Sequence, residues 1–123
     1  MAEKEYEKTR LQDIYDHLKN VGNFEVYFPA QHKGECTSKY VVIRTGVTNQ
    51  VSTFTSTQTE YDILCYVPQS MPSQMDVFFE EVKECMKKLS PMIKSIHTET
   101  EMFYDDMIKG YMRSAQYINY RKF

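Results

Sequence analysis

The clearest guide to the fold is the stretch MDVFFEEVKECMKKL, residues 75–89. Its apolar residues recur at helical spacing and share one face: Met75, Phe78, Phe79, Val82, Cys85, Met86 and Leu89. Pro72 stands near the start and Pro91 follows the end, as expected at helix boundaries. Ser73 with Asp76 three residues on resembles a capping box. The stretch therefore predicts a helix that packs one face on a core.

A second helical pattern precedes it, over residues 5–21. The apolar stripe consists of Leu11, Ile14, Tyr15, Leu18 and Val21. Gly22 and Asn23 then predict the end of this helix. Residues 24–28 then alternate apolar with polar side chains up to Pro29, which predicts a half-buried strand.

The rest of the chain has the composition of strands and turns. Residues 30–38 read as a loop, and the β-branched run 40–44 reads as a central strand. Residues 51–59 and 61–67 predict strands that could form one long bent strand, while 93–102 and 111–121 predict two strands after the second helix, with 104–110 as a turn between them. We expect an α+β fold of order α-β-β-β-α-β-β, with an antiparallel sheet and both helices packed on one face.

Composition places the chain among globular proteins with one core. It has 123 residues, 41% of them hydrophobic, and a formal net charge of −2; this size suits a single domain, residues 1–123. The balance of charge gives no reason to expect binding to nucleic acid or to an anionic membrane. No apolar run approaches the ~18 residues of a membrane span, and the start is charged, so we expect an intracellular protein without a membrane partner.

Catalytic and metal-binding patterns are weak. The three cysteines are far apart; Cys65 and Cys85 fall on predicted apolar faces, which leaves Cys36 as the candidate for exposed chemistry. His32 and Cys36 have the spacing of half a zinc site, but no second pair accompanies them. Nucleophile and phosphate-loop motifs are missing from the sequence. We expect no enzyme activity and no cofactor or metal; an enzyme subunit whose site forms between chains is a remaining alternative.

A second alternative is a small module that binds single-stranded nucleic acid. Lys109-Gly110-Tyr111 opens like an RNA-recognition signature, and aromatic and basic residues then interleave as Arg113, Tyr117, Tyr120 and Arg121. Met112 and Arg113 depart from that signature, and no companion motif precedes it. Tyrosines in such a strand more often pack against a helix.

The most informative stretch for function is Val51–Thr59, in which almost every residue is Ser or Thr. Its β propensity is high but both of its faces are polar, so burial of its own side chains would fix the register of such a strand poorly. It is either a solvent-exposed hairpin arm or an arm that pairs with an adjacent subunit. Residues 99–106 are acidic and the last strand is basic, a pattern that suits subunits set head to tail, or pairing within the chain.

Taken together, these elements resemble the tail terminator and head–tail joining (neck) proteins of tailed bacteriophages. The features that carry the resemblance are the short first helix, the early strand that runs into Pro29, the strand Tyr61–Pro68, and the aromatic closing strand that contains Tyr117 and Tyr120. The resemblance covers nearly the whole chain and rests on pattern.

The resemblance implies a structural virion protein, assembled in the bacterial cytoplasm. Such a protein forms a homo-oligomeric ring, commonly a hexamer, that ends polymerisation of the tail tube protein and docks to the neck or connector, without a cofactor or specific nucleic acid. Carried over by element, the subunit interface would contain Thr53, Phe54, Thr55, Arg121 and Phe123. Glu99 and Glu101 would face an acidic lumen.

Overall fold

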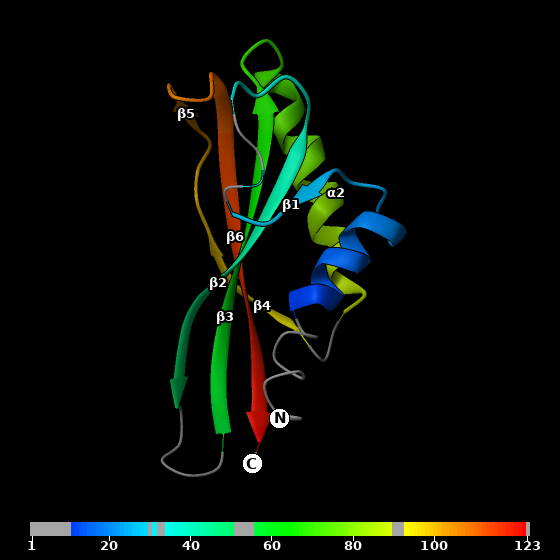
Figure 1. The fold of residues 1–123 in the computed structure, drawn as a ribbon, viewed down its shortest axis with the longest axis vertical. Coiled ribbons are helices and arrows are strands. Elements are labelled where there is room, and N and C mark those ends of the chain that lie inside the picture. Colours follow the sequence, from blue (N-terminus) through cyan, green and yellow to red (C-terminus); the bar gives the residue numbers. More distant parts are fainter. Residues whose placement is uncertain (1–10, 30, 32–33, 51–55, 90–92, 123) are drawn as a thin grey trace.

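The computed structural model describes residues 11–29, 31, 34–50, 56–89 and 93–122, and it shows the expected α+β fold (Figure 1). The first helix is α-helical over residues 11–16 and continues as a π-helical turn, η1 (His17–Val21). The elements that follow are β1 (Val26–Tyr27), β2 (Tyr40–Gln50), β3 (Ser56–Pro68), the 3-10 turn η2 (Pro72–Gln74), α2 (Met75–Lys87), β4 (Lys94–Glu99), β5 (Phe103–Asp105) and β6 (Gly110–Lys122).

The strands form one sheet of six, in the order β1-β2-β3-β6-β4, with β5 also on β6. All pairings are antiparallel, as expected, except at one edge, where β1 runs parallel to β2 with Val26 opposite Val41. The parallel pairing is possible because the chain from residue 28 to 39 is long enough to cross over and return to the start of β2. The sheet is therefore mixed.

Several strand boundaries differ from the prediction. The strand predicted at 24–28 is limited to Val26–Tyr27, and the strand predicted at 40–44 continues to Gln50. The expected strand 93–102 is shorter, since β4 ends at Glu99. The expected turn 104–110 begins with a strand instead, because β5 pairs with β6 and the ring of Tyr104 lies edge-on to that of Tyr111 at 5.3 Å. Only residues 106–109 form the turn.

The helix ends show one confirmed and one wrong prediction. Asn23 has a positive φ of 61° and the Phe24 amide donates to the Leu18 carbonyl at 3.1 Å, which ends the first helix where Gly22 and Asn23 predicted a stop. The capping box is wrong, because Ser73 lies in η2 and α2 begins after Gln74 without a side-chain cap. The chain enters α2 through a tighter turn, so Ser73 does not stand at the cap position.

The core lies between the sheet and the two helices, which cover one face of the sheet. The predicted apolar face of α2 is buried from Met75 to Met86, and Leu89 is partly buried against it. From the first helix Ile14 and Leu18 join this core, but Val21 is 55% exposed. Val21 leaves the expected stripe because the π-helical turn changes the number of residues per turn and rotates it away from the core.

The opposite face of the sheet is covered in part by the chain before β2. The Cys36 amide donates to the carbonyl of Ile108 at 2.7 Å, and Cys36 itself is buried. A cavity of about 230 Å³ on this face is lined by Tyr40, Leu64 and Tyr66, among others. The expectation that Cys36 is exposed is wrong, because the crossover segment packs onto the sheet.

Candidate functional site

The feature that stands out from the body of the fold is an arm of three strands. It consists of residues 46–50 of β2, 56–60 of β3 and 118–122 of β6. Gln50 pairs with Thr57, and Ser56 pairs with Lys122. Figure 1 shows this arm running past the helices, so the layer that covers the core does not extend along it.

A β-bulge marks the point where β2 enters the arm. Thr45 pairs with Tyr61 and Thr48 with Thr59, so β2 carries one residue more than β3 between these pairs. Gly46 lies within the bulge. A bulge bends its strand and increases the local twist. It therefore directs the end of β2 away from the strand's course in the body.

Apart from Ile118, which pairs with Lys94, both outer edges of the arm lack a strand partner among the described residues. On β2, the pairing with β1 stops at Val42, and on β6, the pairing with β4 stops at Ile118. An edge strand presents unpaired amides and carbonyls that another chain can pair with. The arm thus offers two edges for sheet extension.

Only one of the expected interface residues, Arg121, lies within the described part of the chain. Arg121 lies in β6 opposite Thr57. Thr53, Phe54, Thr55 and Phe123 lie outside the described residues. Their described neighbours in the chain, Gln50, Ser56 and Lys122, share the same end of the arm.

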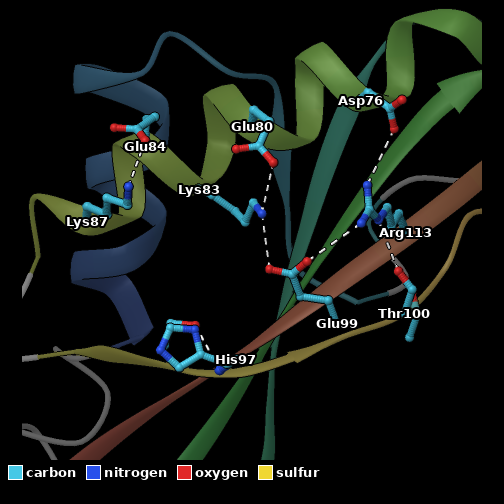
Figure 2. Close-up of polar contacts among 10 residues, drawn as sticks. Asp76, Glu80, Lys83, Glu84, Lys87, His97, Glu99, Thr100 and Arg113 are labelled. Atoms are coloured by element: carbon cyan, nitrogen blue, oxygen red, sulfur yellow. Dashed lines mark hydrogen bonds and ion pairs between the residues drawn. The ribbon is translucent and has the colours of Figure 1, made fainter.

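The expected acidic pair is not on one strand. Glu99 is the last residue of β4, whereas Glu101 follows in the connection to β5 and is exposed. Figure 2 shows the Glu99 carboxylate between two cations: Lys83 Nζ lies 3.1 Å from one oxygen and Arg113 Nη2 lies 3.6 Å from the other. The charge of Glu99 is therefore balanced within the chain.

These two cations also bind the helix to the sheet. The Arg113 guanidinium lies over the Phe79 ring at 4.3 Å, and Lys83 Nζ lies 5.0 Å from the same ring centroid. Burial acts to lower the pKa of Lys83, but its hydrogen bonds to Glu80 and Glu99 outweigh burial and raise it. This cluster was not predicted from the sequence, although Phe79 and Lys83 stand four residues apart on one helix, a spacing at which side chains meet.

Next to this cluster β4 is irregular. Ser95 pairs with Tyr117 and Glu99 with Ala115, so β4 has two extra residues between these pairs. His97 lies in this bulge with φ 58°, a conformation rarely adopted by residues other than glycine. Its amide donates to Ser95 Oγ at 3.0 Å, a contact drawn in Figure 2. The His97 ring lines a cavity of about 400 Å³ between α2 and β4.

The carboxylates beside this cavity are paired with lysine or arginine. Glu80 lies 3.0 Å from Lys83, and Glu84 lies 2.8 Å from Lys87. The hydrogen bond and charge of Lys87 lower the pKa of Glu84. No cluster of three metal-ligating side chains occurs within the described part of the chain. The cavity thus presents paired charges rather than a set of converging ligands.

The spacing of half a zinc site, which is insufficient by itself to predict a metal site, can be followed only at Cys36, since His32 lies outside the described residues. Burial, followed by the nearby Glu25 carboxylate, raises the pKa of Cys36 to about 11. The thiolate is the form that attacks an electrophile or ligates a metal. A buried thiol with a raised pKa is poorly suited to either role.

Of the side chains required by the nucleic-acid alternative, those of Tyr111, Arg113 and Tyr117 are used by the core and the charged cluster, whereas those of Tyr120 and Arg121 are not among the described side chains. Tyr117 is only 4% exposed, and Tyr111 is partly buried against the core. Arg113 contacts Phe79, Glu99 and Asp76. Stacking on bases needs exposed aromatic faces, which Tyr111 and Tyr117 do not provide.

Across the described residues, no helix is long and apolar enough to cross a membrane. The chain matches no known protein-family model and no curated protein.

Proposed function

We propose that this chain is a structural virion protein that forms a ring at the head-proximal end of a phage tail, ends tail tube polymerisation and docks to the neck. The observation that carries the proposal is the three-stranded arm with two strand edges that lack a partner among the described residues. The resemblance of the sequence to tail terminator and neck proteins supports the same function. Its partners are other copies of the chain, the tail tube protein and the neck or connector.

The mechanism is geometric and uses no cofactor. The body, with its helices on one face of the sheet, keeps its shape while the arm meets the neighbouring subunit. Pairing of an arm edge with a neighbour adds backbone hydrogen bonds, and the side chains near the arm's end select the register. When the last subunit closes the circle, commonly a hexamer, no edge is left for another ring to use.

The interface residues that we propose are Thr53, Phe54, Thr55, Arg121 and Phe123, of which Arg121 lies in β6 and the others lie outside the described residues. For the lumen, Glu101 would contribute exposed negative charge, whereas Glu99 is paired with Lys83 and Arg113. A lumen with acidic groups repels the phosphate backbone, so DNA would pass without being gripped. Assembly takes place in the bacterial cytoplasm and the product is part of the virion.

The test uses Phe54→Asp, which places a charge at the proposed interface. The purified variant is mixed with tail tubes, and ring formation at the tube end is scored by electron microscopy. Met107→Asp is the matched control, because Met107 is an apolar side chain, 91% exposed, in the turn before β6 and away from the arm. We expect rings with the wild type and with Met107→Asp but not with Phe54→Asp. Equal ring formation by both variants would contradict the proposed interface.

A further inference from the structure

A groove of about 780 Å³ runs between α2 and the end of the first helix. Its apolar part includes Val21, Phe24 and Val77. Val77 is 65% exposed, on the side of α2 that does not face the core, and Val21 is turned outward by the π-helical turn. Single exposed apolar residues are ordinary, but two that line one groove form a surface that a partner can cover.

The rim of the groove is acidic. Asp76, Glu80, Glu81 and Glu84 line it, against Lys88 alone. Three of these carboxylates have ion-pair partners that do not line the groove: Asp76 pairs with Arg113, Glu80 with Lys83 and Glu84 with Lys87. Glu81 has no ion-pair partner within the described residues. An apolar floor with a negative rim fits an apolar segment that carries positive charge.

The arm of the same protein has this chemistry. Between Gly46 and Thr59 no residue is charged, and beyond Ile118 the charged residues are Arg121 and Lys122. The chain that connects β2 to β3 contributes apolar Val51 and Phe54 by sequence. The described end of the arm therefore carries two basic residues and no acidic one by sequence, which complements the acidic rim of the groove.

The arm cannot reach the groove of its own chain without leaving the sheet. Figure 1 shows the arm extending away from α2, and pairing along β3 and β6 continues as far as Ser56 and Lys122. A contact between arm and groove must therefore join two copies through different surfaces. Head-to-tail contacts of this kind close into rings when the rotation between copies allows it.

We infer that the groove between α2 and the end of the first helix receives the basic end of the arm of a second copy. This inference rests on the proposed ring, because it specifies which surface of the neighbour the arm meets. Arg121 and Lys122 would lie against the acidic rim, with Glu81 as the carboxylate most available to them.

Charge reversal tests the contact in both directions. Glu81→Lys and the double variant Arg121→Glu/Lys122→Glu should each weaken ring assembly on tail tubes by at least tenfold. In a protein that carries all three substitutions the charge at position 81 is again opposite to the charges at positions 121 and 122, and assembly should recover in part, since Asp76, Glu80 and Glu84 keep their ion pairs within the chain. Asp106→Lys, in the exposed turn before β6, is the control and should assemble like the wild type. Assembly by Glu81→Lys at the wild-type level would overturn the inference while leaving the ring itself intact.

Cross-linking identifies the occupant directly. A carbodiimide joins a carboxylate to an amine in contact with it, and a mixture of ¹⁴N- and ¹⁵N-labelled protein shows whether the link joins two copies. We expect a link between Glu81 of one copy and Lys122 of another. A link from Glu81 to Lys4 or Lys8 of the same chain would assign the groove to residues 1–10 and overturn the inference. A wild-type protein that never assembles, alone or on tubes, would overturn the proposed function as well.

Discussion

The guanidinium of Arg113 lies over the ring of Phe79, with 4.3 Å between the guanidinium carbon and the ring centroid. Arg113 belongs to β6 and Phe79 to α2, so this contact joins the helix to the sheet. The same guanidinium donates to the carbonyl of Thr100 at 3.0 Å and lies 3.6 Å from Glu99 (Figure 2). One side chain therefore connects α2, β6 and the end of β4.

Arg113→Ala should lower the free energy of unfolding by about 1–2 kcal/mol, since a partly exposed cation–π contact contributes about 0.5–1 kcal/mol and each ion pair up to about 1 kcal/mol. Urea denaturation measures the change. Lys87→Ala is the control, because the pair of Lys87 with Glu84 is exposed on both sides and should contribute less to stability than the contacts of Arg113. If the two variants were equally stable, the contact with Phe79 would contribute nothing.

A second prediction concerns the buried Asp62 on the opposite face of the sheet. Its carboxylate accepts from Arg44 Nε at 2.9 Å and from Gln116 Nε2 at 3.1 Å. Arg44→Met should cost about 1–3 kcal/mol, because it leaves a buried acceptor with one partner fewer. The double variant Arg44→Met/Asp62→Leu should be closer to the wild type, since it removes the buried charge as well. A double variant less stable than Arg44→Met would contradict this account.

A third prediction is that the fold loses stability in alkali. Burial raises the pKa of Cys36 to about 11, and burial also raises the pKa of Tyr66 and Cys85. An unfolded cysteine releases its proton near pH 8.5. The native state then holds more protons than the unfolded state, so stability is complete below about pH 8.5 and is lost as the pH rises towards 11.

The alkaline loss is measured as the urea midpoint between pH 8 and 11. Cys36→Ala should show a smaller decrease over this range than the wild type, because one group with a raised pKa is gone. A decrease of the same size in both proteins would show that Cys36 does not contribute.

Much of the fold follows from local pattern. The α2 helix was predictable because its apolar residues keep helical spacing from Met75 to Met86, and β2, β3 and β6 because their β-branched and aromatic residues suit a pleated, half-buried surface. The parallel pairing of β1 with β2 was not predictable, because partner and direction depend on where the crossover segment packs. The strand β5 has only three residues, too few to show the alternation that predicts a strand. Its pairing with β6 holds it in the sheet.

Part of the candidate site could likewise be predicted from the sequence, and part could not. The polar tract before Thr59 indicated an arm, and the described parts of β2, β3 and β6 form one. The groove was not visible in the sequence, because periodicity placed Val21 on the core stripe, and only the π-helical turn at His17–Val21 turns it outward. His97 likewise gave no signal, since its positive φ arises from the mismatch in length between β4 and β6.

The mass of the assembled protein tests the central claim most directly. Native mass spectrometry of the purified chain, alone and after incubation with phage tail tubes followed by release, gives the number of copies per particle. We predict a single closed species whose mass is a whole multiple of 14.6 kDa, six times that mass for a hexamer. A chain that stays at 14.6 kDa under both conditions, and leaves tube growth unchanged, would contradict the ring.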